Sequence, residues 1–335
     1  MTFVLKCTKQ TVLEKTGKKV AIIGAGPAGL KAADELICLG HEVYVYDQMP
    51  EAGGLLVFGI PEDRIRKESV REYVKQLKDA GVIFKTNIQV GRDVKFIDLI
   101  KDYDAVLLAT GAWSNRRMKL PGVDLRGVYY ALDLIIHNNY EKLGYPDNFH
   151  PPLLTGNVVV IGGGLTAVDA CAMALEKKAK KVILMYRRTK EYAPAGRKMI
   201  ERLQSLGVEY DELSQPVEFM GDDRGNLKAV KAVRTRLIEN GAKGHPRPVP
   251  IENTEYIILA DSVLLATGLT PSFPTDAIDV VKASNRGGGE TFRTNIANVF
   301  MAGDVKHGAS FIFPAIQSGV KVAELIHEYL VNRKD

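Results

Sequence analysis

Short buried runs of aliphatic residues alternate with helical stretches along this chain of 335 residues. The run at 19–23 precedes an Ala- and Leu-rich helix expected over 26–39, which ends at Gly40 before a second strand at 42–46. Strand, helix and strand in this order predict a βαβ unit with a parallel sheet. The pattern then restarts with a strand at 157–161. It therefore predicts an α/β chain with two doubly wound domains.

The remaining periodic segments complete this plan. Residues 51–68 form a connection rich in Gly and Pro, and residues 208–260 alternate in short strand-like pieces that predict an antiparallel addition. The other expected elements are helices at 69–80, 165–178 and 311–330, and strands near 82–90 and at 104–108, 181–186 and 262–265.

Two glycine-rich turns follow the first strand of each pattern. They read Gly-Ala-Gly-Pro-Ala-Gly at 24–29 and Gly-Gly-Gly-Leu-Thr-Ala at 162–167, and an Ala-Thr-Gly exit recurs at 109–111 and 266–268. The chain therefore contains an approximate internal duplication of a Rossmann-like, dinucleotide-binding domain. The last strand and helix belong to neither repeat, so we expect the second domain to be inserted in the first. The expected domains are 1–113 with 286–335, and 114–285.

The first turn has the features of an FAD site. Glycines allow the backbone to approach a pyrophosphate at a helix N-terminus. Asp47 ends the second strand 23 residues after Gly24 (47 − 24), where an acid accepts hydrogen bonds from ribose and repels a 2′-phosphate. The residues expected in this turn are Gly24, Gly26, Pro27, Ala28 and Gly29.

The second turn is followed by two arginines instead of an acid. Arg187 and Arg188 come directly after the second strand of this unit, and guanidinium groups suit a ribose 2′-phosphate. The pattern favours NADPH, although an arginine that serves only as a surface ion-pair partner would leave NADH possible. The residues expected to hold this nucleotide are Gly162, Gly164, Leu165, Thr166, Ala167, Arg187, Arg188 and Gly268.

Composition narrows the function further. The net charge is +5, but the basic residues are scattered, so the charge pattern does not favour nucleic-acid binding. No apolar stretch has the length of a membrane span, and the first residues lack the core of a secretory signal, so we expect a cytoplasmic protein. The three cysteines show no C-x-x-C spacing, and no metal-ligand pattern stands out.

Three segments carry a resemblance to a known family. They are Gly-Gly-Leu-Leu-Val-Phe-Gly-Ile-Pro at 53–61 with Lys67 beyond it, Tyr-Arg-Arg-Thr-Lys-Glu at 186–191, and Ala-Gly-Asp at 302–304. Over residues 18–333 the chain resembles the small (beta) subunits of glutamate synthase, within the flavoproteins that have two dinucleotide-binding domains. It departs from them at Leu165, where their turn has an acid, and at Ala193, where Met is frequent.

The resemblance implies further FAD contacts. Gly53, Gly54 and Leu55 would face the phosphates or the ribityl chain, and Asp304 would hold a ribityl hydroxyl. Read without the resemblance, Gly53 and Gly54 form a turn, and Asp304 caps the next helix. The expected flavin contacts beyond the first turn and Asp47 are Gly53, Gly54, Leu55, Val90, Ala109, Thr110, Gly111, Gly303, Asp304 and Ser310.

Taken together, these patterns predict an FAD-dependent NAD(P)H:acceptor oxidoreductase with no catalytic side chain of its own, because the cofactors carry the chemistry. Family members usually carry an N-terminal domain with cysteines for iron–sulfur clusters, whereas about 17 residues precede the first strand here. We therefore expect an iron–sulfur protein or a ferredoxin-like subunit as partner, which would make the assembly a hetero-oligomer. The alternatives are a non-catalytic flavin-binding scaffold and a disulfide reductase, which would need the absent cysteine pair.

Overall fold

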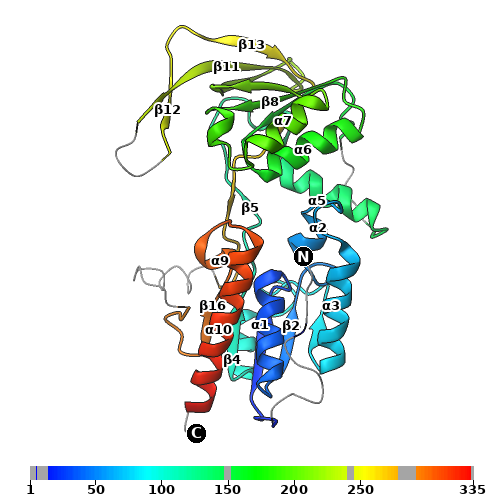
Figure 1. Cartoon of the computed structure of the whole chain (residues 1–335), viewed down its shortest axis with the longest axis vertical. Helices are drawn as coiled ribbons and strands as arrows, with labels where there is room; N and C mark the ends of the chain where they lie inside the picture. Colours follow the sequence, from blue (N-terminus) through cyan, green and yellow to red (C-terminus); the bar gives the residue numbers. More distant parts are fainter. Residues whose placement is uncertain (1–4, 6–13, 147–151, 240–244, 278–291, 333–335) are drawn as a thin grey trace. The chain divides into compact units, whose positions relative to one another are not determined.

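The computed structural model describes the chain except for residues 1–4, 6–13, 147–151, 240–244, 278–291 and 333–335 (Figure 1). By its internal contacts the chain forms two compact units, Met1–Ser114 with Leu269–Asp335, and Asn115–Gly268. Two short strands, β5 (Ser114–Asn115) and β15 (Leu269–Thr270), pair where the chain passes from one unit to the other.

The first unit is built on a five-stranded parallel sheet with the order β16-β4-β1-β2-β3. Because the last strand of the chain pairs with β4, the C-terminal block returns to the first unit as expected. The strands are β1 (Lys19–Ile23), β2 (Glu42–Tyr46), β3 (Ile83–Lys85), β4 (Ala105–Leu108) and β16 (Val299–Met301). The helices are α1 (Pro27–Cys38), α2 (Leu55–Phe58), α3 (Lys67–Ala80), α4 (Phe96–Asp102), α9 (Asp304–His307) and α10 (Ile312–Asn332).

Alternation along β1 divides the core of the first unit between the two faces of its sheet. Val20 and Ile22 pack with α1, α3 and α10 on one face, while Ala21 and Ile23 pack with α4 on the other. Helices α1 and α10 lie side by side (Figure 1). They approach closely at Gly319, where an added Cβ would lie 2.5 Å from the carbonyl oxygen of Ala28. The same α1 carries the first glycine-rich turn, so α10 supports it from behind.

The second unit repeats this strand order except at one edge, where the outer strand comes first in the unit instead of last. Its parallel sheet runs β6-β14-β7-β8-β9, with the glycine-bearing strand β7 in the same central place as β1. The strands are β6 (Val128–Tyr130), β7 (Asn157–Ile161), β8 (Lys181–Tyr186), β9 (Glu209–Glu212) and β14 (Ser262–Leu265). The helical segments are α5 (Ala131–Lys142), α6 (Leu165–Glu176), the 3₁₀ turn η1 (Lys190–Tyr192) and α7 (Arg197–Ser205).

An antiparallel sheet covers one face of this second parallel sheet. It contains β10 (Ser214–Gly221), β11 (Leu227–Ile238), β12 (Arg247–Pro250) and β13 (Tyr256–Leu259), and Figure 1 shows β11, β12 and β13 together in yellow-green and yellow. Val159 and Ile161 pack against it, while Val158 and Val160 pack with α5, α6 and α7. The antiparallel addition expected from residues 208–260 is therefore present.

The structure differs from the sequence expectations in two places. The strand expected near 82–90 is limited to β3, because the chain turns at Asn87, whose φ is +57°. The expected domain boundary at 285/286 lies outside the described residues, and the compact units divide at 268/269 instead. Residues 269–277 stay with the first unit because Thr275 and Asp276 hydrogen-bond to the backbone of Gly91 and Phe96.

Candidate functional site

The first glycine-rich loop joins β1 to α1, and its close contacts require glycine. Gly24 has a φ of +107°, and an added Cβ would lie 2.4 Å from the carbonyl oxygen of Ala109. At Gly29 an added Cβ would lie 1.9 Å from the carbonyl oxygen of Gly24. At Gly26, by contrast, nothing lies within 4 Å of an added Cβ. The loop is therefore fixed on its inner side and open on the side of Gly26.

The N-terminus of α1 adds a partial positive charge to this open side. The helix begins at Pro27 after Gly26, no side chain caps it, and its first turn has no acidic residue. Ala28 and Gly29 continue this first turn and are buried. Uncapped amides at a helix start bind phosphate groups. The loop and the helix together fit the pyrophosphate of a dinucleotide.

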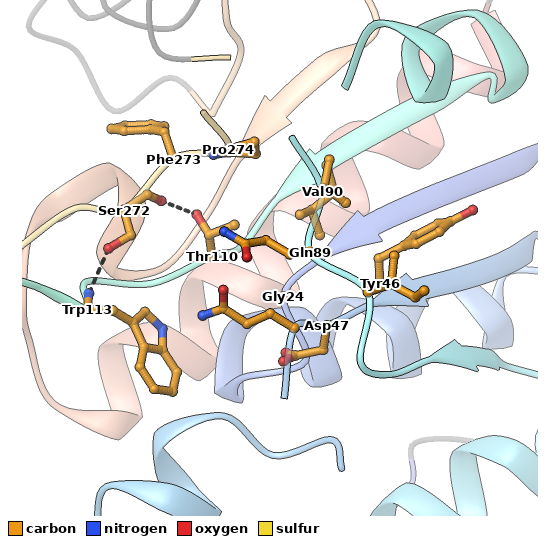
Figure 2. A pocket seen from close by; sticks show the side chains of 13 residues that line it. Gly24, Tyr46, Asp47, Gln89, Val90, Thr110, Trp113, Ser272, Phe273 and Pro274 are labelled. Carbon is orange, nitrogen blue, oxygen red and sulfur yellow. Dashed lines mark hydrogen bonds between the residues drawn. The ribbon is translucent and has the colours of Figure 1, made fainter. Parts of the chain in front are cut away.

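A pocket continues from this loop along the carboxyl ends of the first unit's strands, where ligands bind in doubly wound folds (Figure 2). Gly24, Asp47, Val90 and Thr110, four of the residues predicted as flavin contacts, line it together. The sequence did not single out the other lining residues, which are Ile23, Tyr46, Gln48, Ile88, Gln89, Trp113, Ser272, Phe273 and Pro274.

Asp47 is the charged group of this pocket. Its side chain is buried, and its two oxygens accept hydrogen bonds from the backbone amides of Ala25, at 2.5 Å, and Met49, at 2.8 Å. Burial raises the pKa of Asp47 to about 6, although both amide hydrogen bonds act in the opposite direction. Each carboxylate oxygen has a second lone pair, so Asp47 can still accept a ribose hydroxyl.

The Gly53-Gly54-Leu55 segment packs against the first loop. The Gly53 amide donates to the carbonyl of Ala25 at 2.9 Å, and an added Cβ at Gly54 would lie 3.0 Å from the Cα of Gly26. Both glycines have positive φ, +135° and +54°, and Leu55 then starts α2. The segment is therefore more than a flexible turn, because it packs against the backbone of Ala25 and Gly26.

The Ala109-Thr110-Gly111 exit is held by Ser272, which lies 162 positions after Thr110. The Thr110 hydroxyl donates to the carbonyl of Ser272, and the Ser272 amide donates to the carbonyl of Gly111 at 3.0 Å. The Ser272 hydroxyl accepts the amide of Trp113 at 2.9 Å (Figure 2). No local signal marks Ser272, because its role depends on the return of the chain to the first unit.

The carboxyl end of β16 also reaches the first loop. Gly303 has a φ of +73°, and an added Cβ there would lie 2.8 Å from the Cβ of Ala28. Asp304 starts α9 without capping it, and its carboxylate accepts the hydroxyl of Ser310 at 2.5 Å. The structure therefore places Gly303 beside the first loop and joins Asp304 to Ser310, while the capping alternative for Asp304 is not observed.

The second loop repeats the geometry of the first. Gly162 has a φ of +152°, and an added Cβ would lie 2.4 Å from the carbonyl oxygen of Ala266, the counterpart of Ala109. Gly164 has nothing within 4 Å of an added Cβ, and the helix after it is uncapped. Leu165, Thr166 and the buried Ala167 form the first turn of α6. This loop therefore has the same open, amide-bearing side.

The two arginines of the second unit differ in their surroundings. Arg187 is exposed, whereas Arg188 donates from Nε to the carbonyl of Pro246 at 3.0 Å and lies 3.5 Å from the hydroxyl of Tyr186. Gly268, the last expected contact, has a φ of +104° and nothing within 4 Å of an added Cβ. Arg187 is thus the arginine whose charge is open to a ligand.

The described residues contain neither a metal site nor a membrane-spanning helix. Among them, no group of three or more His, Cys, Asp or Glu side chains has the arrangement that a metal ion needs. No helix in the described ranges combines the length and the apolar character of a membrane span.

Comparison with known proteins places the chain in a family. The model of the pyridine nucleotide-disulphide oxidoreductase family matches residues 18–322. The glutamate synthase [NADPH] small chain of Escherichia coli is 37% identical over 330 residues, which cover 95% of this chain and 70% of that protein. The NADP(+)-dependent formate dehydrogenase subunit beta of Moorella thermoacetica is 36% identical, and this chain spans 45% of its length.

A solved structure supports the same fold. Mycobacterium tuberculosis FprA in complex with NADPH superposes with a TM-score of 0.79, covering 94% of this chain and 85% of FprA at 21% identity. The expected α/β architecture and the resemblance to glutamate synthase small subunits are therefore confirmed, and the predicted class of FAD- and NAD(P)-dependent oxidoreductase agrees with this family. The chain belongs to the pyridine nucleotide-disulphide oxidoreductase family, and within it to the relatives of the glutamate synthase small chain.

Proposed function

We propose that this chain is the electron-transferring subunit of a larger enzyme, which exchanges electrons between NAD(P)H and an iron–sulfur protein or a ferredoxin through FAD. One observation carries the proposal. Two glycine-rich loops, with the same contact at their first glycine and the same open side, stand in two units whose parallel sheets match except at one edge strand. A chain with two such loops is best explained as one that binds two dinucleotides.

The first unit is proposed to hold FAD. Its loop and the α1 N-terminus would bind the pyrophosphate, and Asp47 would accept from the adenosine ribose while repelling a 2′-phosphate. Gly53, Gly54 and Leu55 would line the phosphates, and Gly303 and Asp304 the ribityl chain. When bound, FAD supplies the redox chemistry, because a flavin accepts electrons in pairs and releases them singly.

The second unit is proposed to hold NADPH. Gly162, Gly164 and the α6 N-terminus would bind its pyrophosphate, and Arg187 would face the 2′-phosphate. Arg188 is tied to Pro246 and Tyr186, so it would contribute charge and support the turn. The bracketed nucleotide in the name of the E. coli relative, NADPH, agrees with this choice.

The partner is proposed from the names of the relatives and from the cysteines. A small chain and a subunit beta are parts of assemblies. The three cysteines of the sequence have no C-x-x-C spacing, which is the spacing of the redox-active pair in thioredoxin-like disulfide chemistry. An external one-electron acceptor fits better, and the net charge of +5 would favour an acidic one.

The test is electron transfer to an added acceptor. The FAD-loaded chain, reduced with NADPH without oxygen, is mixed with oxidised ferredoxin or with a disulfide substrate. We expect ferredoxin to be reduced while the disulfide stays intact. Disulfide reduction, or full turnover with a small organic acceptor and none with ferredoxin, would contradict the proposal.

A further inference from the structure

A lysine is buried directly behind the Gly53-Gly54-Leu55 segment. Lys67 begins α3, and its side chain is 5% exposed. Its ammonium donates to the carbonyl of Leu56 at 2.7 Å and to the carbonyl of Ile60. Within the described part of the chain, no carboxylate forms an ion pair with this ammonium. A buried cation that bonds only to carbonyls is costly to desolvate, so its place needs an explanation.

The two carbonyls belong to the turn that follows the flavin-facing segment. Leu56 lies in α2, and Ile60 comes two residues after that helix ends. The last carbonyls of a helix have no partner within it, and a cation there satisfies them and interacts well with the helix dipole. Lys67 therefore closes the turn from Leu56 to Ile60 and ties it to α3, against which α2 packs (Figure 1).

The front of the same segment touches the first glycine-rich loop. The Gly53 amide donates to the carbonyl of Ala25, and an added Cβ at Gly54 would make a tight contact of 3.0 Å with the Cα of Gly26. The segment is thus held between two fixed points, the loop in front and the Lys67 ammonium behind. A shift of the Lys67 ammonium would therefore move the backbone that packs against Ala25 and Gly26 of the loop.

We propose that Lys67 is a positioning residue for FAD, which holds the Gly53–Ile60 backbone against the nucleotide and places a buried positive charge behind it. The inference rests on the proposed FAD site of the first unit. It goes beyond that site because Lys67 need not touch the flavin to set how firmly the flavin is held.

The protonation of Lys67 gives the proposal a pH signature. Burial lowers the pKa of Lys67 to about 8; Glu62 and Glu51 act to raise it, and Arg64 and Arg71 act to lower it further. The Glu62 carboxylate also accepts the backbone amide of Lys67 at 3.2 Å. A neutral amine keeps hydrogen-bond donors but loses the charge, so FAD should be held less tightly above pH 8 than below it.

The experiment measures FAD release from the holoenzyme. Wild type, Lys67→Met, Lys67→Arg and Lys75→Met are diluted at several pH values between 6.5 and 9.5, and the fluorescence of released FAD gives its dissociation constant. Lys75 is an exposed lysine on the same helix and serves as the matched control. Apo-protein melting temperatures report any separate loss of stability.

Four results are expected together. In wild type the dissociation constant rises several-fold as the pH passes 8, while Lys67→Arg stays charged and shows no such rise. Lys67→Met binds FAD about tenfold or more weakly at pH 7, with no rise at higher pH. Lys75→Met follows wild type.

Two results would overturn the inference. One is a wild-type dissociation constant that does not change between pH 7 and pH 9.5, a result that stands even if Lys67→Met does not fold. The other is a Lys67→Met variant that binds FAD as wild type does. A wild-type chain that binds no FAD at all would instead refute the proposed function, so the two failures are distinguishable.

Discussion

Two histidine rings from distant parts of the chain meet in the first unit, and their contact predicts a loss of stability in mild acid. His41 lies just before β2, and its Nε2 is 2.9 Å from Nδ1 of His327 on α10. The Thr16 hydroxyl lies 2.7 Å from the other ring nitrogen of His41. Because α10 supports the first glycine-rich loop through α1, the histidine pair helps to fix the helix behind the proposed FAD site.

Burial, and next the neighbouring His327, lower the pKa of His41 to about 4, while Asp104 acts weakly to raise it. An unfolded histidine has a pKa near 6.5, so between pH 6.5 and pH 4 the unfolded chain binds a proton that the folded chain does not. Stability is therefore complete above pH 6.5 and falls as the pH is lowered. Linkage gives about 2 kcal/mol at pH 5, and solvent screening reduces this to about 1–2 kcal/mol.

The assay is urea unfolding at pH 7 and pH 5 for wild type, His41→Gln and His245→Gln. His245 is exposed and serves as the control. We expect His41→Gln to be less stable at pH 7, because a buried contact is lost, but to lose about 1–2 kcal/mol less than wild type on going to pH 5. His245→Gln should follow wild type.

The comparison between variants cancels the contribution of other titrating groups to the change in stability. Asp47 is one such group: its pKa is raised in the folded chain, so it adds stability as the pH falls, whereas His41 removes stability. An equal loss of stability in wild type and His41→Gln between pH 7 and pH 5 would refute the reasoning.

The glycine-rich loops and the arginine give three further predictions. Gly24→Ala should lower the melting temperature, because the contact with Ala109 and the positive φ reduce the free energy of unfolding by about 2–4 kcal/mol. Gly26→Ala should melt as wild type does but bind FAD about tenfold more weakly. Equal FAD dissociation constants for wild type and Gly26→Ala would contradict the proposal that the pyrophosphate binds on the open side of the first loop. Gly164→Ala should weaken NADPH binding in a fluorescence titration and leave FAD bound; loss of both would show that the loops do not act separately. Arg187→Ala should raise the dissociation constant of NADPH about tenfold or more and leave that of NADH unchanged, and an equal change for both would rule out a 2′-phosphate contact.

The strongly periodic elements of the fold could be predicted from the sequence. The helix expected over 26–39 is α1 at Pro27–Cys38, and the helix expected over 311–330 is α10 at Ile312–Asn332. In both, apolar residues recur at helical spacing over at least three turns, and glycine or proline marks an end. The strands at 19–23 and 157–161 were predictable for a related reason, since buried parallel strands are continuous apolar runs.

The short elements could not be predicted, because tertiary contacts decide them. Four residues, Leu55–Phe58, form α2 within a stretch that reads as a connection, and the Lys67 ammonium donates to the carbonyl of Leu56 in this helix. Residues after β3 have the composition of a strand but turn at Asn87 to join the loop around Val90. Neither outcome has a local sequence signal of sufficient length.

The proposed site was predictable where chemistry is concentrated in a motif, and not where distant segments meet. Gly24, Asp47 and Thr110 follow strands of one sheet, so the parallel arrangement brings them to one edge. Ser272 reaches the same pocket from 162 positions after Thr110, and no local sequence signal marks it. The burial that raises the pKa of Asp47 and lowers that of Lys67 is likewise a property of the folded chain.

The central claim is that this one chain binds a flavin and a nicotinamide nucleotide and passes a pair of electrons between them. The most direct measurement is anaerobic stopped-flow absorbance of the FAD-loaded chain mixed with NADPH. We expect rapid bleaching of the visible flavin absorbance in wild type. In Gly164→Ala we expect slow bleaching, whose rate returns to that of wild type at high NADPH. Flavin absorbance that persists with both NADPH and NADH would contradict the account and favour a flavin-binding scaffold.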